Sequence, residues 1–254
     1  MKMTQSIALS ACLLSIMTVN GFAQISYDEA LSEFVASGIA YKEGRYDAAI
    51  TGYNKILEGG RTSGPLQYNL GNSYFKKGNI GKAILSYERA MKFMPRDSDL
   101  NFNYKYVQSK TDQYDFPGES NIFNRLIHGY IKFYTVDEMV IILAGIIMVM
   151  GILFLVSLYA RLTETIRVGG LILLTLVLIG YGLGLVIKAH DETDMAVVMK
   201  SAESYFEPRT DSTVHFKISE GLKTKILKSE GHWVKIQRLD GKIGWIDRDA
   251  LEKI

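Results

Sequence analysis

Two long apolar runs in the middle of the chain constrain the fold more than any other feature. Residues 139–160 and 168–187 contain no Asp, Glu, Lys or Arg. Because about 20 apolar residues in a helix span the hydrocarbon core of a bilayer, the sequence predicts transmembrane helices over 136–160 and 168–188. The short connection between them predicts a tight antiparallel hairpin. Its flanking arginines favour the cytoplasm, so we expect both chain ends on the opposite side of the membrane.

The residues around these runs predict how the hairpin begins and packs. Residues 120–134 place apolar side chains at helical spacing, which predicts an amphipathic helix at the membrane surface or, alternatively, a helix packed on the preceding domain. Thr135 and Glu138 have the spacing of a capping box. The second span has a small-residue face that suits close packing on the first span or on a partner's helices. Its members are Gly169, Gly170, Gly180, Gly182 and Gly184.

The first 23 residues have the pattern of a secretory signal peptide. Lys2 precedes the apolar run 7–19, and cleavage is expected after Ala23. A competing lipoprotein signal ends at Cys12, but few apolar residues precede it and the run continues past it. Either signal exports the residues that follow across the inner membrane of a bacterium. We therefore expect both soluble domains in the periplasm.

Composition argues against several classes of function. A net charge of +2 lacks the basic excess that nucleic-acid binding needs. The one cysteine, Cys12, lies in the predicted signal, so neither disulfides nor thiolate metal sites are expected. The sequence shows no Ser/His/Asp, Cys/His or paired-acid arrangement and no phosphate-binding glycine loop. We expect no enzyme and no cofactor. The histidines are scattered, without a partner at metal-ligand spacing: His128, His190, His215 and His232.

A shift of 34 residues superimposes small and aromatic residues of the N-terminal half. Gly44 falls on Gly78, and Tyr53 falls on Tyr87. A period of 34 with this pattern resembles the tetratricopeptide repeat, a pair of antiparallel helices. Residues 64–97 carry the pattern best.

The array of repeats is short and uneven. The first repeat, 30–63, departs from the family pattern at Ala36, Ser37 and Ala40, where the family prefers Leu-Gly and Tyr. A single further helix follows Pro95, and we expect it to cap the array. The predicted helical domain covers 26–112.

In this family the first helices line a concave groove that binds extended peptides. Asn72 and Asn103 match two asparagines that hold a peptide backbone in such members. The basic residues that clamp a chain end in some members are not matched as a set. Alternatively, the aromatic residues at these positions are packing residues or face another part of this chain. The groove that the resemblance implies consists of Phe34, Tyr41, Lys42, Tyr68, Asn72, Phe75, Lys76, Phe102, Asn103 and Tyr106.

The pattern beyond Lys188 changes to alternation of apolar and polar residues, which predicts strands. Asp240-Gly241 predicts a hairpin turn, and about five short strands predict a small closed barrel. The segments EGLKTKIL, GHWVKI and DGKIGWI resemble a bacterial SH3 domain over 194–254. The resemblance implies binding of cell-wall peptides or of protein segments, although Trp245 is equally a core residue. The candidate ligand face consists of Tyr205, Phe206, Trp233 and Trp245.

The order of signal peptide, repeats, membrane hairpin and SH3 domain resembles the BatE family of the Bacteroides aerotolerance (Bat) group over the full length. The resemblance rests on the repeat pattern, the hairpin and the DGKIGW segment together. It implies a membrane-bound partner of Bat proteins that carry von Willebrand A domains. It also implies a link to a MoxR-type ATPase and a role in stress or oxygen tolerance.

The sequence therefore predicts a multidomain protein with an all-α tetratricopeptide superhelix, a two-helix transmembrane hairpin and an all-β SH3-like barrel. The leading hypothesis is a scaffold in the inner membrane that docks Bat-type partner proteins. The alternative is a tether that binds peptidoglycan through its SH3 domain. The lipid bilayer is a partner in either case, and nucleic acid is not expected.

Overall fold

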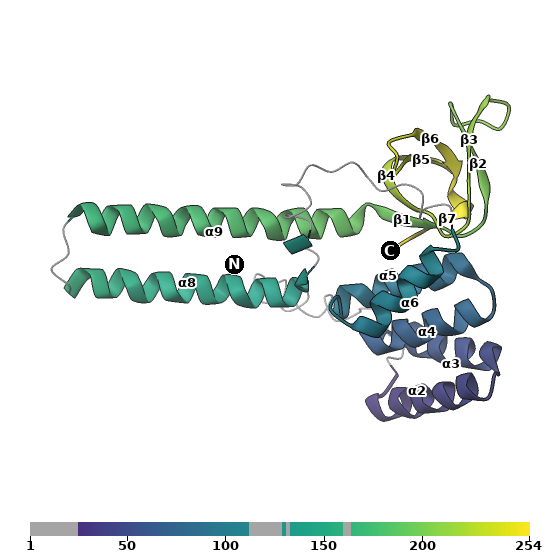
Figure 1. The fold of residues 1–254 in the computed structure, drawn as a ribbon, viewed down its shortest axis with the longest axis horizontal. Coiled ribbons are helices and arrows are strands. Elements are labelled where there is room, and N and C mark those ends of the chain that lie inside the picture. The colour runs from purple at the N-terminus through teal and green to yellow at the C-terminus, as the bar shows by residue number, and fades with distance from the viewer. Residues whose placement is uncertain (1–24, 112–128, 131–132, 160–163) are drawn as a thin grey trace, which may run out of the picture.

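The structure is a computed structural model that describes residues 25–111, 129–130, 133–159 and 164–254. It has three parts, which are a set of short helices, a long two-helix hairpin and an antiparallel sheet (Figure 1). This confirms the predicted multidomain layout of helical and β parts. The predicted signal peptide and all but a few residues of the predicted amphipathic helix lie outside the described residues.

The N-terminal part consists of two helical hairpins and one further helix, as the repeat pattern predicts. Glycines with positive φ, Gly44 at +77° and Gly78 at +82°, make the turn inside each hairpin, a conformation that glycine adopts without a steric penalty. Ser63 caps the first helix of the second repeat, because its side chain accepts a hydrogen bond from a backbone N–H of that helix. The helices are α2 (Tyr27–Lys42), α3 (Tyr46–Glu58), α4 (Gly64–Lys76), α5 (Ile80–Phe93) and α6 (Ser98–Gln108).

The 34-residue period reappears in the packing of these helices. Tyr53 and Tyr87 are each 1% exposed, and Ala49 and Ala83 are fully buried. Equivalent positions of the two repeats therefore form equivalent parts of one continuous core. Small residues at these positions let the paired helices approach each other, and the tyrosine rings fill the space between them.

The two repeats place the small residue that lets their helices approach each other on different helices. This difference explains the unusual sequence of the first repeat. In the second repeat, a Cβ added at Gly71 would lie 2.7 Å from the ring of Tyr87. Ser37 occupies the position equivalent to Gly71, and Gly52 on the facing helix makes room for it. A Cβ added at Gly52 would lie 2.1 Å from Ser37 Oγ. The required space is thus supplied by α3 in one repeat and by α4 in the other.

The apolar runs form a hairpin of α8 (Val136–Tyr159) and α9 (Glu164–Thr193). Within it, 136–157 and 168–189 are long and apolar enough to cross a membrane, with mean hydropathies of 3.1 and 2.5. The predicted capping box is confirmed, because Thr135 N–H donates to Glu138 Oε2 (2.9 Å) and Glu138 N–H donates to Thr135 Oγ1 (3.1 Å). Helix α9 is longer than predicted and continues almost directly into the sheet.

The predicted packing of the glycine face on the first span is not found. A Cβ added at Gly169, Gly170, Gly180 or Gly182 would meet nothing within 4 Å, and at Gly184 it would reach only Met139 Cε at 4.0 Å. Glycines allow close approach only where the neighbouring helix lies over them. Here α8 packs along a different face of α9.

The C-terminal strands form a single sheet, and the prediction of a closed barrel is wrong. The strand order is β3-β2-β6-β5-β4-β1-β7, so β3 and β7 are edges. Strand β7 has three residues, and the carbonyls of Lys253 and Ile254 accept hydrogen bonds from Arg89 and Lys92 of α5 instead of pairing with β3. The strands are β1 (Met195–Val198), β2 (Ala202–Tyr205), β3 (Val214–Ile218), β4 (Lys223–Glu230), β5 (Trp233–Arg238), β6 (Ile243–Asp247) and β7 (Leu251–Lys253).

Alternation of side chains builds the core of this sheet, as predicted. Phe216, Ile218, Val234 and Ile236 are buried at every second position of β3 and β5. The predicted Asp240-Gly241 hairpin joins β5 to β6, with Gly241 at a φ of +87°.

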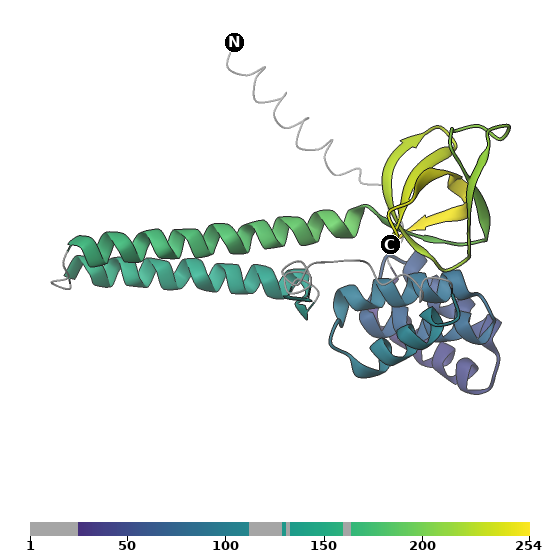
Figure 2. The ribbon, with the colours of Figure 1, turned by 45° about the horizontal axis from the view of Figure 1, so that its top comes forward.

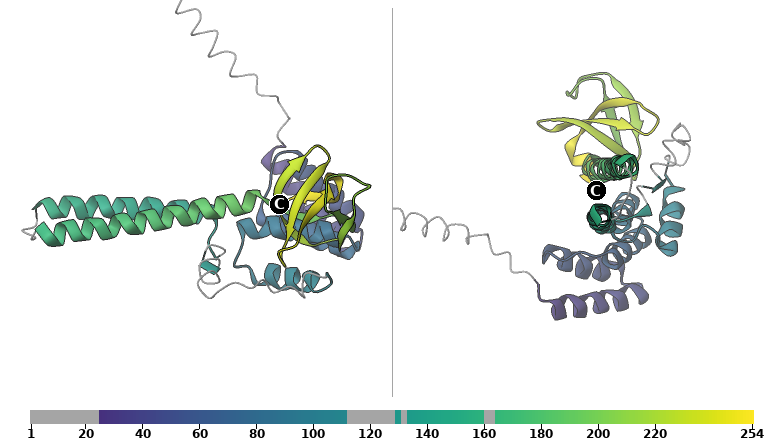
Figure 3. Two further views of the ribbon diagram at one scale, coloured as in Figure 1. Left: turned by 90° about the horizontal axis from the view of Figure 1, so that it is seen from above. Right: turned by 90° about the vertical axis from the view of Figure 1, so that its left-hand side faces the viewer.

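The repeats and the sheet lie together at one end of the hairpin, and the last residues of α8 and the first residues of α9 lie at the other (Figures 1 and 2). Viewed along the hairpin, the sheet lies on one side of it and the repeats on the other (Figure 3, right). If the hairpin spans a bilayer, both soluble parts therefore face the same aqueous compartment.

Gly71→Ala is expected to destabilise the second repeat by about 1–3 kcal/mol, because the new Cβ overlaps the Tyr87 ring. Helix propensity alone predicts the opposite sign, a gain of about 1 kcal/mol. Gly38→Ala is the matched control, since a Cβ there lies an ordinary 3.7 Å from Tyr53 Oη. Hydrogen exchange of α4 and α5 in the full-length protein in detergent measures the effect. Equal protection in the two variants would contradict the packing argument.

Candidate protein-binding groove and the interface behind it

The helical repeats carry an open groove of about 340 Å³ on the side of their first helices. Seven of the ten residues that the family resemblance implies line this groove. They come from three helices, and Tyr87 of α5 and Val107 of α6 complete the lining. The lining residues are Tyr41, Asn72, Phe75, Lys76, Tyr87, Phe102, Asn103, Tyr106 and Val107.

The remaining three implied residues do not line the groove. Phe34 packs inside the first repeat, with its ring centroid 5.7 Å from that of Tyr53. Lys42 is exposed at the end of α2. Tyr68 supports the groove from behind, since its ring lies 6.1 Å from the Tyr87 ring.

Hydrogen bonds between three helices hold the polar part of the groove. Asn72 Oδ1 accepts from Tyr87 Oη (2.7 Å) and from Asn103 Nδ2 (3.1 Å). Asn103 Nδ2 also donates to Tyr68 Oη at 2.8 Å. Burial raises the pKa of Tyr87, so its hydroxyl stays a neutral donor to Asn72. The two asparagine side chains are therefore fixed in position before any ligand arrives.

This network leaves a donor and an acceptor for a ligand. It uses the carbonyl oxygen of Asn72 and the amide nitrogen of Asn103. The other ends of the two side chains, a donor on Asn72 and an acceptor on Asn103, lie outside the network. An extended peptide backbone presents the complementary groups at every residue.

Aromatic side chains supply the apolar part of the groove. Phe102 is 71% exposed and Tyr106 is 49% exposed. Phe75 meets Tyr106 edge-on, with ring centroids 5.7 Å apart, and Lys110 Nζ lies 5.0 Å from the centroid of the Tyr106 ring. Exposed rings beside fixed polar groups are typical of surfaces that bind other proteins.

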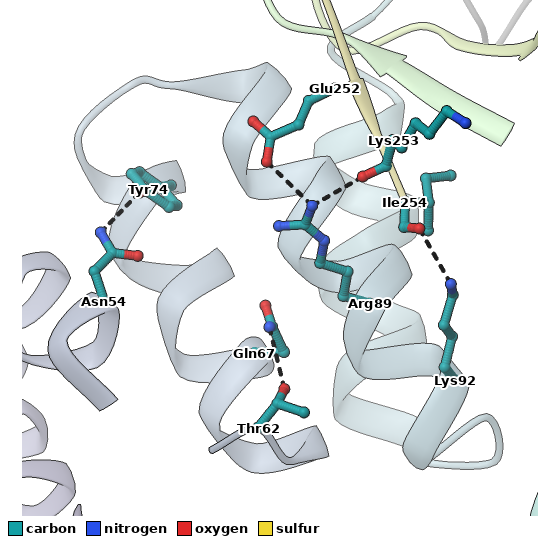
Figure 4. A network of polar contacts seen from close by, with 9 residues as sticks. All are labelled: Asn54, Thr62, Gln67, Tyr74, Arg89, Lys92, Glu252, Lys253 and Ile254. Carbon is teal, nitrogen blue, oxygen red and sulfur yellow. Dashed lines mark hydrogen bonds and ion pairs between the residues drawn. The ribbon is translucent and has the colours of Figure 1, made fainter. Parts of the chain in front are cut away.

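The sheet packs on the opposite side of the repeats, against α5. Val197 of β1 is fully buried and belongs to the core of the repeats, and Met199 and Ile254 pack against the same core. Arg89 donates to the carboxylate of Glu252 (3.1 Å) and to the carbonyl of Lys253 (2.8 Å) (Figure 4). These contacts leave the groove open.

A buried charged group connects the sheet to the helix that lines the groove. Glu88 of α5 accepts from Lys223 Nζ of β4 (2.7 Å) and from Tyr104 Oη of α6 (2.6 Å). Burial, reinforced by the Glu88 carboxylate, raises the pKa of Tyr104 well above its usual value. Tyr104 therefore remains a hydrogen-bond donor. This contact could not be predicted from the sequence, because Lys223 is 135 positions from Glu88 and the three residues belong to no motif.

The predicted SH3 ligand face divides into two groups of residues. Tyr205 and Trp233 meet edge-on at 5.5 Å, and Trp245 lies beside them across the strands of β2, β6 and β5. Trp245 is 7% exposed, and Lys235 Nζ lies 5.8 Å from the centroid of its ring. Phe206 lies apart from this cluster and stacks on His215 at 4.1 Å. Tyr205 and Trp233 are half-buried.

Comparison with known families identifies two parts of the chain. A family model of the tetratricopeptide repeat matches residues 65–97. A family model of the bacterial SH3 domain matches residues 205–252. The chain contains a tetratricopeptide repeat and a bacterial SH3 domain. No curated protein matches the chain. Within the described ranges, no three His, Cys, Asp or Glu side chains gather in a way that would hold a metal ion.

Lys223→Met is expected to weaken the interface by about 2–3 kcal/mol, because it removes the ion pair between Lys223 and the buried carboxylate of Glu88. The control is Lys228→Met on the same strand. Lys228 pairs with Glu230 on the surface, where an ion pair contributes at most about 1 kcal/mol. Hydrogen exchange of α5 and β7 in the full-length protein reports the difference. Equal loss of protection in both variants would show that the interface does not depend on this contact.

Proposed function

We propose that this protein is a membrane-anchored, non-enzymatic scaffold that holds an extended segment of a partner protein in its tetratricopeptide groove. The carrying observation is that seven implied groove residues surround one open groove while the SH3 domain packs on the other side of the repeats. Repeats of this family mediate protein interactions, and the fixed asparagines and exposed rings fit a peptide backbone with apolar side chains.

The hairpin serves as the membrane anchor in this proposal. Its two apolar helices have the required length, and both soluble parts lie at the same end of it. The arginines that flank the connecting loop and the N-terminal export signal favour a cytoplasmic loop. The groove and the SH3 domain then lie in the periplasm.

The resemblance to the BatE family favours a particular partner. It points to membrane-bound Bat proteins with von Willebrand A domains, which are themselves linked to a MoxR-type ATPase. A partner anchored in the same membrane is held near the groove, so even weak binding yields a stable complex through effective concentration.

Replacing the apolar part of the groove is expected to release the partner. Phe75→Ala combined with Phe102→Ala removes two rings that line the groove, and a loss of at least tenfold in co-purified partner is expected. Ile39→Ala is the control, because Ile39 is 50% exposed on α2 and does not line the groove. A photo-reactive residue at position 106 in intact cells identifies the partner. An unchanged yield in the double variant, or capture of only this chain, would contradict the scaffold.

A second candidate function, binding of peptidoglycan, is favoured by the aromatic cluster of the SH3 domain. Tyr205 and Trp233 meet at the surface of β2 and β5 beside the buried Trp245, with Lys235 next to the Trp245 ring. Rings of this kind bind the apolar parts of peptide stems, and some bacterial SH3 domains bind the cell wall. Because Val197 belongs to the core of the repeats, the full-length protein is the appropriate sample.

If the cluster binds peptidoglycan, the detergent-solubilised protein sediments with isolated sacculi. Tyr205→Ala with Trp233→Ala is then expected to reduce the sedimented fraction at least fivefold, since stacking of rings on a ligand is lost. Phe206→Ala serves as control, because Phe206 is 57% exposed but lies apart from the cluster. Absence of the wild-type protein from the pellet would exclude this function and leave the scaffold proposal intact.

A further inference from the structure

The SH3 domain has a second surface hollow that neither the groove nor the aromatic cluster uses. Its volume is about 360 Å³. It lies where β4 and β5 face the short edge strand β7, next to the side on which the sheet fails to close. The lining residues are Ile226, Ser229, Val234, Arg248, Leu251 and Lys253.

This hollow lies beside the point where α9 enters the sheet. The backbone N–H of Ile226 donates to the carbonyl of Asp194 at 2.7 Å, and Asp194 directly follows α9. Lys253 is paired with Ala196 in the register of β7 and β1. Two of the lining residues are therefore direct neighbours of the first residues after the helix.

The membrane surface lies at the same level if α9 spans the bilayer. The apolar part of α9 ends at Ala189, and the helical rise of about 1.5 Å per residue carries the chain about 7 Å further to Asp194. The headgroup layer of a bilayer is roughly 5–8 Å thick on each side. The hollow therefore opens at the level of the lipid headgroups. This step rests on the proposed insertion of the hairpin.

The chemistry of the lining fits an amphiphilic anion. It combines two cations, Arg248 and Lys253, with apolar side chains and contains no carboxylate. Figure 4 shows that the Lys253 side chain extends away from α5, whereas the neighbouring Glu252 carboxylate points toward Arg89. Glu230, at the end of β4, pairs with Lys228. The acidic side chains of β4 and β7, Glu230 and Glu252, are thus engaged by other cations.

We propose that this hollow binds the headgroup of an anionic phospholipid. Arg248 and Lys253 contact the phosphate, and Ile226, Val234 and Leu251 contact the glycerol and the first acyl carbons. Because the SH3 domain is packed on α5, a lipid held here fixes the tilt of the repeats on the membrane surface. It thereby sets the direction in which the groove faces a partner in the same membrane.

Lipid binding by the full-length protein in detergent tests the proposal by native mass spectrometry. The probes are phosphatidylglycerol and phosphatidylcholine with identical acyl chains. We expect at least tenfold more bound phosphatidylglycerol, and Arg248→Gln with Lys253→Gln should reduce it to the level of phosphatidylcholine. Lys217→Gln with Lys242→Gln removes two exposed cations that do not line the hollow and should change nothing. Equal binding of both lipids, or equal losses in both double variants, would overturn the proposal.

The position of the bound lipid provides a second, independent readout. Phosphatidylglycerol with a photo-reactive headgroup is expected to label peptides within 226–234 and 248–253. Labelling confined to α8 and α9 would show lipid around the spans only and would overturn the site. Resistance of the wild type and both double variants to carbonate extraction reports insertion of the hairpin separately. Extraction of the wild type would therefore refute the anchor itself, not the hollow alone.

Discussion

Val197 stands in the sheet but is buried in the core of the helical repeats, and the arrangement of the soluble parts depends on this contact. Around it, β1 and β7 lie against α5, the Gly81 N–H donates to Glu220 Oε1 at 2.8 Å, and Lys223 reaches the buried Glu88. A Cβ at Gly81 would lie 2.8 Å from the carbonyl of Val198, so the two backbones approach as closely as a glycine permits. An apolar contact surrounded by buried hydrogen bonds joins the two domains into one unit.

The same unit is attached to the hairpin at two points. Asp194 alone separates α9 from β1, so the sheet is joined to the second span with almost no linker. On the other side, Arg96 makes two hydrogen bonds to the Glu138 carboxylate at the start of α8 and one to the carbonyl of Phe133. Its guanidinium also lies 5.1 Å from the centroid of the Phe133 ring. Two hydrogen bonds from one guanidinium to one carboxylate fix the relative orientation of the repeats and α8 more than they add to stability. The groove therefore has a defined direction relative to the spans.

Features that depend on residues close together in the chain were predicted from the sequence. Features that depend on contacts between distant residues were missed. The helical hairpins, the spans, the capping box at Thr135 and the Asp240-Gly241 turn follow from neighbours a few residues apart, and the resemblance to the tetratricopeptide family placed most of the groove. The sheet docks on α5 through contacts such as that between Gly81 and Glu220, which are 139 positions apart in the chain. A contact between such distant residues produces no repeating pattern in the sequence. The open sheet was missed for the same reason, since strand patterns do not show that β7 bonds to a helix. Glycine content likewise did not reveal which face of α9 meets α8.

The docked sheet also covers apolar surface of a short repeat array. Two repeats and one additional helix bury little apolar surface by themselves, and capping elements add to the buried core of such arrays. Helix α6 covers one edge with Leu100 and Val107, which are almost fully buried. Val197, Met199 and Ile254 cover the outer face of α5. Because this cover lies opposite the groove, it adds rigidity without occupying the binding surface. A rigid groove loses less conformational freedom when a ligand binds, so the position of the SH3 domain contributes to affinity at a site it does not touch.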